Sequence, residues 1–381
     1  MKEIKLLHVS DVHLGSEFSS IPEKQEERQK ELLRTFRKIT QLCIKESVDV
    51  MLIAGDLFEG ANVRPDIVKS VKTYLEETHC KVFISPGNHD YVAMDSPYEE
   101  EGWPNNVKIF RGKMERILLP ELEVAVYGAG FESTYVRTSL FDTYLPIEED
   151  MINLCVLHGE LVSDSQTSEY HGITSSALVR SKMDYVAIGH IHMRSPIRKE
   201  GKTYFAYAGC PEGRGFDELG EKGVYIGTVQ KDNVNLAFKP MNQRMYLIEE
   251  IDVSQLQNEI IAEAYILNYL MNKYGNDYKD HFYRVKLKGA VSEVNALPWK
   301  NIELALKDEL YFISLVDETV PFVNYEEVAK ETSLKGFFVK KLLEEMGRAE
   351  QIKDEKACEK IKKALDFGMR AFEGQVELHD Y

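Results

Sequence analysis

The amino-acid sequence predicts an α/β fold, organised as a layered domain, a smaller α/β domain and a helical C-terminal segment. Over residues 1–240, short apolar runs typical of buried strands alternate with charged amphipathic stretches typical of helices. A shorter α/β pattern occupies residues 241–322, and the pattern over residues 323–381 is helical. A chain of 381 residues is also too long for one ordinary domain, and its length alone favours two domains.

The first domain contains apolar runs rich in Val, Ile, Leu or Tyr, which predict strands covered on both faces. Residues 23–46 carry apolar side chains at helical spacing and predict an amphipathic helix. Two later strands, near residues 204–208 and 224–229, are expected to be antiparallel. The other predicted strands are Leu6–Ser10, Val48–Ala54, Lys81–Ser85, Val124–Gly128, Asn153–Leu157 and Tyr185–Ile188.

The pattern changes after Pro240. Strands are predicted over residues 246–253, 283–287 and 311–316, with a helix over residues 299–310. Another helix has Ser254 as its predicted N-cap and Gly275 at its end. Its predicted buried side consists of Leu256, Ile260, Ala264, Leu267 and Met271. The C-terminal segment carries two apolar stripes, which are Phe338, Leu342 and Met346, and then Ile361, Leu365, Met369 and Phe372.

The composition limits the classes of function. The net charge is −16, with −9 up to residue 240 and −7 after it, which argues against nonspecific coating of nucleic acid. No apolar run approaches the length of a membrane span, and the N-terminus has no secretory layout. The five cysteines form no CxxC pair, which is typical of reduced thiols. We expect a cytoplasmic protein without membrane contact.

Five groups of metal-ligand side chains each follow a predicted strand. Because strand ends converge on one edge of an α/β sheet, we expect these groups to meet there. Carboxylates and imidazoles together suit Mn, Fe or Zn, and the glycines among them allow tight turns and close backbone approach. Each group alone is a weak signal, and His158 alone would be interpreted as a core histidine; the series is a strong signal. The groups are Asp11-Val12-His13, Gly55-Asp56, Gly87-Asn88-His89-Asp90, His158-Gly159 and Gly189-His190-Ile191-His192.

With these motifs, residues 1–235 resemble the calcineurin-like metallophosphoesterase superfamily. The resemblance implies a four-layer α/β/β/α sandwich that holds two divalent metal ions about 3.5 Å apart. We expect Mn, with Fe or Zn as ions that the same donors would accept. The resemblance assigns Asp11, His13 and His192 to the first metal, Asn88, His158 and His190 to the second, and Asp56 to a bridging position.

The resemblance places His89 beside the scissile phosphate as a residue that binds no metal. A hydroxide that bridges the metals would attack the phosphorus, and a protonated His89 would stabilise the departing alkoxide. Asp90 has two interpretations of equal weight. It acts as a second catalytic residue that orients His89 and raises its pKa, or it serves only the turn that follows Gly87-Asn88-His89.

Three further segments resemble the SbcD/YhaO-type DNA repair nuclease subunits of this superfamily. Two residues depart from the pattern of those subunits. These are Glu59, at a position where the subunits have Asp, and Cys210, and both leave every predicted metal ligand in place. The resemblance implies exonuclease cutting of DNA and leaves endonuclease cutting open. The segments are Leu7–Gly15 (LHVSDVHLG), Gly55–Glu59 (GDLFE) with Arg64-Pro65 after it, and Tyr207–Gly223 (YAGCPEGRGFDELGEKG).

Basic residues after the last motif are candidates for contacts to phosphate. Between His190 and Gly215, five basic residues stand against two acidic ones. We single out Arg214 and Arg194 as substrate-binding residues. The alternative is an ordinary solvated hairpin, which we favour for Arg198 and Lys199.

The resemblance also implies partners. In such nucleases a capping domain follows the catalytic domain, and C-terminal helices dock on the coiled coil of an SbcC-like ABC-type ATPase. The candidate docking residues here are Phe337, Phe338, Leu342, Leu343 and Met346. Packing of these helices on their own domain is an equal alternative, and a homodimer stays open.

Two other functions remain open. Because phosphatases of many kinds share the five motifs, the chain could be a phosphomonoesterase or a cyclic-nucleotide phosphodiesterase with a small substrate. It could also be mainly a partner-binding subunit with a weakly active metal site, although the intact ligand set argues against this.

Overall fold

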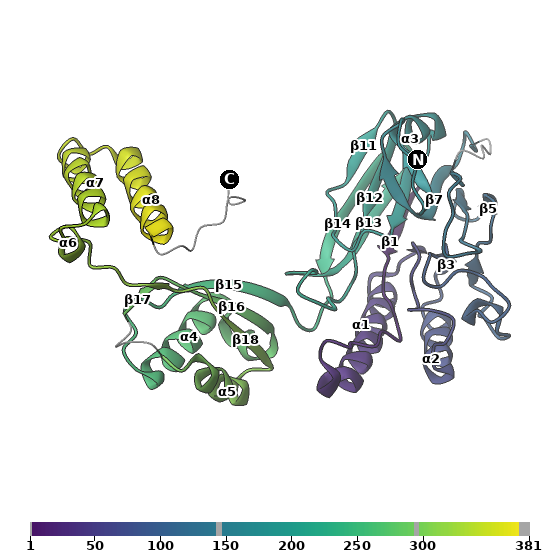
Figure 1. The fold of residues 1–381 in the computed structure, drawn as a ribbon. Coiled ribbons are helices and arrows are strands. Elements are labelled where there is room, and N and C mark those ends of the chain that lie inside the picture. Colours follow the sequence, from purple (N-terminus) through teal and green to yellow (C-terminus); the bar gives the residue numbers. More distant parts are fainter. Residues whose placement is uncertain (1, 142–146, 293–296, 373–381) are drawn as a thin grey trace. The chain divides into compact units, whose positions relative to one another are not determined.

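The computed structural model describes residues 2–141, 147–292 and 297–372, and the chain divides into two compact units (Figure 1). The first unit comprises Met1–Ile248 and Asp280–Tyr283, and the second comprises Glu249–Lys279 and Arg284–Tyr381. The second unit contains most of the two segments predicted after residue 240, but residues 241–248 and 280–283 belong to the first unit. Residues 373–381 of the predicted helical segment lie outside the described residues.

The first unit contains two six-stranded sheets. The first sheet consists of β1 (Glu3–Val9), β2 (Val50–Ile53), β3 (Lys81–Ile84), β4 (Val107–Ile109), β13 (Gly223–Gln230) and β14 (Asn233–Pro240), in the order β14-β13-β1-β2-β3-β4. The second consists of β5 (Glu115–Leu119), β6 (Val124–Gly128), β7 (Ile152–His158), β10 (Tyr185–Gly189), β11 (Arg198–Glu200) and β12 (Thr203–Tyr207), in the order β11-β12-β10-β7-β6-β5. The neighbours β1, β2, β3 and β4 are parallel, as are β6, β7, β10 and β12, so each set directs its carboxyl ends to one edge.

The two sheets face each other across an apolar core. Leu6 and Leu52 from the first sheet pack in one cluster with Leu154 and Val156 from the second, and all are buried. Burying each such side chain contributes about 1.5–3 kcal/mol, so this interface holds the two sheets together.

Helices cover the outer faces of both sheets. Helix α1 (Gln25–Glu46) packs on the first sheet, where Sγ of Cys43 lies 3.9 Å from Sδ of Met51, and α2 (Pro65–Glu76) contacts α1. Helix α3 (Ser175–Ser181) packs its Ala177 and Leu178 on the second sheet. The predicted α/β/β/α sandwich is therefore confirmed. Shorter elements of this unit are η1 (Pro22–Lys24), η2 (Pro97–Glu99) and the paired strands β8 (Glu160–Val162) and β9 (Gly172–Thr174).

The second unit begins with a small α/β arrangement. Strands β15 (Tyr246–Asp252), β16 (Phe282–Lys288) and β18 (Phe312–Asp317) form a sheet in the order β15-β16-β18, with ends of β15 and β16 in the first unit. Its helices are α4 (Glu259–Tyr274) and α5 (Trp299–Glu309), and η3 (Gly275–Asp280) follows α4. A further pair is β17 (Ala290–Val291) with β19 (Val320–Pro321).

The predicted N-cap and buried side of α4 are wrong. Asn258, and not Ser254, caps the helix by accepting a hydrogen bond from the backbone N–H of Ile261 at 2.9 Å, while Oγ of Ser254 accepts one from Ala290. The buried side chains of α4 are Ala262, Ile266 and Leu270, whereas Ile260 is 79% exposed. The later start of the helix places a different row of residues against its neighbours.

The C-terminal helices are α6 (Tyr325–Val328), α7 (Leu334–Gln351) and α8 (Glu355–Phe372). Val339 of α7 and Leu365 and Met369 of α8 form a small core, against which Phe338, Leu342, Leu343 and Ile361 pack. Most of the two predicted stripes is therefore used in packing α7 against α8. Phe337, one of the candidate docking residues, is instead 64% exposed.

Among the described helices, none combines the length and the apolar character needed to cross a lipid bilayer.

Candidate metal centre

The predicted metal ligands lie just after five parallel strands. Asp11 and His13 follow β1, Asp56 follows β2, and Asn88 follows β3 of the first sheet. The second sheet contributes His158 at the end of β7, with His190 and His192 after β10. Short contacts between their side chains bring these seven residues together at an edge that the two sheets share.

Three ligands predicted for one metal form a close group. Nε2 of His13 lies 3.1 Å from Nε2 of His192, and Asp11 completes a set of donor atoms that lie within 4.8 Å of one another. Two imidazole nitrogens that face each other beside a carboxylate are a typical arrangement for binding one metal ion.

The ligands predicted for the other metal form a second group. Oδ1 of Asn88 lies 3.0 Å from Nε2 of His158 and 3.1 Å from Nδ1 of His190. Oδ2 of Asp56 lies 3.4 Å from Nε2 of His158 and 3.7 Å from Nε2 of His13. Asp56 therefore stands between the two groups, as a bridging carboxylate must.

Three further observations show that the centre fits a cation. Oδ2 of Asp11 is buried and accepts no hydrogen bond from the described residues, so a carboxylate oxygen is left for a ligand. Burial lowers the pKa of His158, but the carboxylate of Asp56 outweighs it and raises that pKa to about 9. Burial and the charge of His158 lower the pKa of His190 to about 4, which keeps that imidazole neutral and able to bind a metal. Positive charge is thus stabilised beside Asp56, as binding of a divalent cation requires.

The backbone around the ligands adopts conformations that most residues avoid. Asp11, His13 and Asp56 have φ values of 52°, 51° and 48°, in the left-handed region. Hydrogen bonds from the N–H of Asp11 to Gly55 and from the N–H of His13 to Asp56, of 3.0 and 2.9 Å, hold the loops together. Such backbone strain concentrates at functional sites, where surrounding contacts enforce it.

Glycine is required where the loops approach each other. A Cβ on Gly55, whose φ is +83°, would lie 2.2 Å from Nδ1 of His158. A Cβ on Gly87 would lie 2.2 Å from Oδ1 of Asp56. These glycines therefore allow the close approach that their place in the motifs predicted.

Outer contacts orient the imidazoles. Nδ1 of His192 donates a hydrogen bond to Glu218 at 2.5 Å, and Nδ1 of His158 donates one to the backbone O of Ala54 at 3.0 Å. In both rings these bonds leave Nε2 directed to the ligand cluster. The sequence alone did not single out Glu218, which lies in the Tyr207–Gly223 segment.

Glu59 connects the metal ligands to His89. Its two carboxylate oxygens lie 3.1 Å from Nδ1 of His13 and 3.3 Å from Nδ1 of His89. The hydrogen bond to Glu59 raises the pKa of His89, whose side chain is 40% exposed. Burial would raise the pKa of Glu59, but these two histidines lower it, so Glu59 carries a negative charge beside His89.

Asp90 does not orient His89. Its oxygens accept hydrogen bonds from the backbone N–H groups of Gly87, Leu57 and Phe58, and from the hydroxyl of Tyr98. Burial, followed by the charge of Asp56, raises the pKa of Asp90 to about 6. The structure therefore contradicts the catalytic interpretation of Asp90 and supports the turn interpretation, because these bonds tie the two ligand loops together.

Arg214 lies beside the centre, whereas Arg194 is held elsewhere. Nη1 of Arg214 lies 2.8 Å from Glu59, and Nη2 lies 3.3 Å from Glu218. The guanidinium of Arg194 instead stacks on the ring of Phe238, at 3.9 Å from its centroid. The contacts of Arg194 thus do not support its predicted role in substrate binding, because its guanidinium packs on the ring of Phe238.

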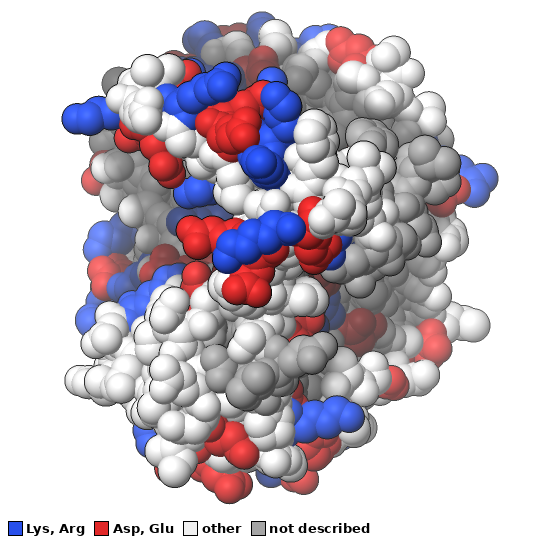
Figure 2. All heavy atoms as spheres, turned by 60° about the vertical axis from the view of Figure 1, so that its left-hand side comes forward, with Lys and Arg blue, Asp and Glu red and all other residues white. Residues whose placement is uncertain are grey.

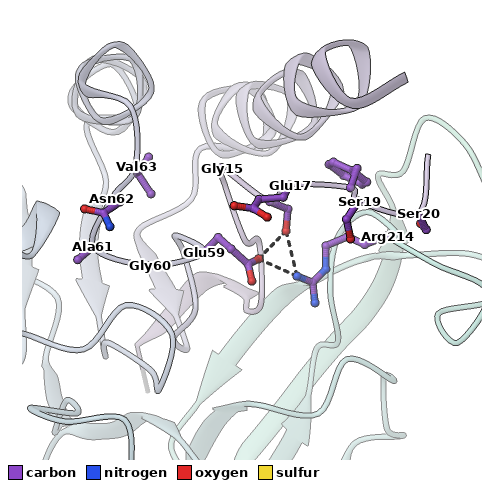
Figure 3. A pocket seen from close by; sticks show the side chains of 12 residues that line it. Gly15, Glu17, Ser19, Ser20, Glu59, Gly60, Ala61, Asn62, Val63 and Arg214 are labelled. Carbon is purple, nitrogen blue, oxygen red and sulfur yellow. Dashed lines mark hydrogen bonds and ion pairs between the residues drawn. The ribbon is translucent and has the colours of Figure 1, made fainter. Parts of the chain in front are cut away.

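A pocket of about 620 Å³ adjoins Glu59 and Arg214 (Figure 3). Figure 3 shows the Glu59 and Arg214 side chains joined by a dashed line, with Asn62 and Val63 on the other side of the view. Nη1 of Arg214 donates to Oγ of Ser16 at 3.1 Å, and Ser16 donates to Glu59. The Arg214 charge is therefore shared with acidic neighbours, but it still faces a space next to the metal centre.

A buried ionic network anchors the loop that carries Arg214 and Glu218. Arg28 of α1 is fully buried, pairs with Glu31, and lies 3.2 Å from Glu212. Its guanidinium also donates to the backbone O of Gly213 at 2.8 Å. The contact from α1 thus positions the wall of the metal centre through the residues just before Arg214.

The charges on the surface are mixed. On the face drawn in Figure 2, Lys and Arg side chains are interspersed with Asp and Glu side chains, and they do not form a continuous basic band. This agrees with the net charge of −16.

Buried carboxylates and imidazoles at the common edge of two parallel-stranded sheets define the site of a metal-dependent hydrolase. The model of the calcineurin-like phosphoesterase family matches residues 4–194, and the chain belongs to this family.

Curated relatives match a longer part of the chain. The chain is 28% identical over 270 residues to "Uncharacterized metallophosphoesterase YhaO" of Bacillus subtilis. This match covers 68% of this chain and 65% of that protein. It is 24% identical over 274 residues to "DNA double-strand break repair protein Mre11" of Saccharolobus solfataricus. That match covers 68% of this chain and 69% of the relative. A protein with the same Mre11 description from Archaeoglobus fulgidus is 24% identical, over 92% of this chain and 82% of its own length. The chain thus spans about two thirds of the length of the first two relatives.

Proposed function

We propose that this chain is a metal-dependent DNA nuclease, an exonuclease that uses two divalent metal ions, with Mn as the metal, and the nuclease subunit of an SbcCD-like repair complex. The observation that carries the proposal is the pairing of His89 with Glu59 beside the ligand cluster. The relatives described as DNA double-strand break repair proteins support the choice of DNA as substrate.

The pairing provides what cleavage of a phosphodiester requires. The leaving group of a diester is an alkoxide, which departs readily only if an acid protonates it. Because Nδ1 of His89 is engaged by Glu59, its other nitrogen, Nε2, is the atom that can give a proton to the leaving oxygen. The hydrogen bond to Glu59 raises the pKa of His89, which favours the protonated imidazole that such an acid needs.

The remaining residues bind and position. Asp11, His13 and His192 would hold one cation, and Asn88, His158 and His190 the other, with Asp56 between them. When bound, the two cations would acidify a water molecule and neutralise charge on the phosphate oxygens. Arg214, held 2.8 Å from Glu59, would contact a phosphate beside the cut.

The net charge of −16 suggests that a partner adds affinity for DNA. We infer that the partner is an SbcC-like ABC-type ATPase that docks on α7 through its exposed apolar residues, Leu334 and Phe337, which are 75% and 64% exposed. A Phe337→Ser variant would then lose co-elution with that ATPase. Lys340→Ser, at an exposed position of the same helix, is the control and should keep it.

The activity is tested with the purified full chain, stripped of metal and reconstituted with Mn. Its substrates are labelled single-stranded and duplex DNA, p-nitrophenyl phosphate and bis-p-nitrophenyl phosphate. We expect His89→Gln to lose DNA cleavage by about 100-fold or more while it retains its metal, because it lacks the general acid. His79→Gln, which replaces an exposed histidine after α2, is the control. Turnover of the monoester alone would refute the proposal and indicate a phosphomonoesterase.

A further inference from the structure

Three aromatic rings form a row that ends at the metal centre. The ring of Tyr170 lies 4.8 Å from that of His190, with an angle of 33° between the planes. The ring of Tyr135 lies 5.7 Å from that of Tyr170, at an angle of 42°. Since His190 is a candidate metal ligand, the row leads from the surface of the first unit to the place where a phosphate would bind.

The backbone holds Tyr135 and Tyr170 side by side. Val136 and Tyr170 form a parallel bridge. The N–H of Val136 donates to the O of Glu169 at 2.8 Å, and the N–H of His171 donates to the O of Val136 at 2.7 Å. Two segments that are distant in the sequence are thus joined at the point where their tyrosines meet.

The outer ring is available to a ligand. Tyr135 is 51% exposed, and Tyr170 is half-buried between it and His190. Single exposed aromatic residues are common on protein surfaces and need no explanation. Tyr135 differs because its ring continues, through one neighbour, to a residue of the metal centre.

The charges beside the row favour an uncharged ligand group. Glu169 pairs with Arg137 at 2.9 Å, and Glu160 accepts a hydrogen bond from Ser168 at 2.8 Å. The charge of Glu169 is offset by Arg137, whereas the carboxylate of Glu160 would repel a phosphate placed over the tyrosines. A flat, neutral π-system suits the position, while its attached phosphate would occupy the metal centre.

We propose that Tyr135 and Tyr170 form a stacking platform for a nucleobase of the DNA substrate next to the scissile phosphate. The inference rests on the proposed nuclease function. Every base has a π-face, so such a platform binds a single strand with little preference for sequence. It also supplies affinity without basic side chains, which suits a chain with a net charge of −16.

The first experiment compares two oligonucleotides with the same backbone, oligothymidylate and an analogue that is abasic on both sides of the cut. The wild-type protein should cut the base-bearing strand with a kcat/KM roughly 5- to 100-fold higher. Tyr135→Ala should remove this preference and leave cleavage of the abasic analogue, which has no base to stack beside the cut, unchanged. Tyr135→Phe, which keeps the ring, should behave as wild type.

Tyr74→Ala is the control. Tyr74 lies near the carboxyl end of α2, which leads to the start of β3, so it belongs to the edge of the sheet opposite the metal centre. Its replacement should leave both substrates unaffected.

The second experiment measures binding without turnover. An oligonucleotide that contains 2-aminopurine loses fluorescence when that base stacks, and it is titrated into each variant in the His89→Gln background. The quenching should be present with Tyr135, remain with Tyr135→Phe and disappear with Tyr135→Ala.

The outcomes separate the two proposals. If the wild type cuts oligonucleotides and Tyr135→Ala changes neither the base preference nor the quenching, the platform is refuted and the nuclease function stands. If the wild type hydrolyses bis-p-nitrophenyl phosphate but no oligonucleotide, the nuclease function is refuted, and the platform with it.

Discussion

His192 donates a hydrogen bond from Nδ1 to Oε1 of Glu218 at 2.5 Å. Burial lowers the pKa of His192, but this bond to Glu218 outweighs it, so the pKa is raised. The same bond fixes the tautomer in which Nε2 carries no proton once a metal binds, and that nitrogen faces His13. Glu218 therefore acts on the metal centre through the ring of His192.

Replacing Glu218 with Gln should weaken binding of Mn by about 10- to 100-fold, as loss of such an outer-shell carboxylate typically does. The amide can still accept a hydrogen bond, but it carries no charge to support the imidazole. Isothermal titration of the metal-free protein with Mn measures the effect. Asp217→Asn, at the exposed neighbouring position, is the control, and equal losses in both variants would contradict the specific role of Glu218.

Removal of metal should lower the thermal stability of the protein. The carboxylates of Asp11 and Asp56 are buried, at 1% exposure each, and a cation compensates their charge. A metal at 100 times its Kd stabilises the native state by about 2.7 kcal/mol, which corresponds to a Tm shift of about 5–10 °C for a domain of this size.

Differential scanning calorimetry with Mn and with EDTA measures that shift. The first unit of an Asp56→Asn variant should respond much less to Mn, because the variant lacks the bridging carboxylate. A wild-type Tm that is the same in Mn and in EDTA would show that the cluster binds no metal under these conditions.

The sequence predicted the ligand set because each ligand belongs to a short motif at the end of an apolar strand. Since such strand ends converge, the motifs were sufficient to place Asp11, Asp56 and His158 at one edge of the fold. Glu59 and Glu218 could not be assigned roles, because their partners come from loops that are distant in the sequence. Glu59 meets His13 and His89, and Glu218 meets His192, only in the folded chain.

Asp90 and Ser254 show why local rules failed elsewhere. Asp90 is next to His89 in sequence, but its side chain is buried on the other side of the loop, where three backbone N–H groups lie. Ser254 has the residue type of an N-cap, yet Asn258 is the better placed cap. In both cases tertiary contacts determined which of several suitable polar groups was used.

Arg28→Ala should destabilise the first unit by about 3–5 kcal/mol, because it leaves Glu212 buried without its cation, while Glu31 keeps its ion pair with Arg244. Urea unfolding followed by circular dichroism measures the change in the free energy of unfolding. Arg34→Ala, at an exposed position of the same helix, should change it by less than about 0.5 kcal/mol. Equal stability of the two variants would show that the network around Arg28 does not hold the loop.

His8 should make the folded state sensitive to acid. It is fully buried between the two sheets, where its Nδ1 lies 2.9 Å from the hydroxyl of Tyr185. Burial lowers the pKa of His8 from 6.5 to about 3, so between these pH values the unfolded chain binds a proton at His8 that the folded chain does not. The stability from a neutral His8 is therefore fully present above pH 6.5. It falls by about 1.4 kcal/mol for each pH unit below 6.5, until the folded state also binds the proton near pH 3.

Urea unfolding measures this contribution at pH 7.5 and at pH 5.5. Between these pH values, His8→Leu should lose about 1.4 kcal/mol less stability than the wild type. His79→Asn, at an exposed position with a left-handed backbone, should match the wild type at both pH values, and the same pH dependence in all three proteins would show that His8 does not control acid sensitivity.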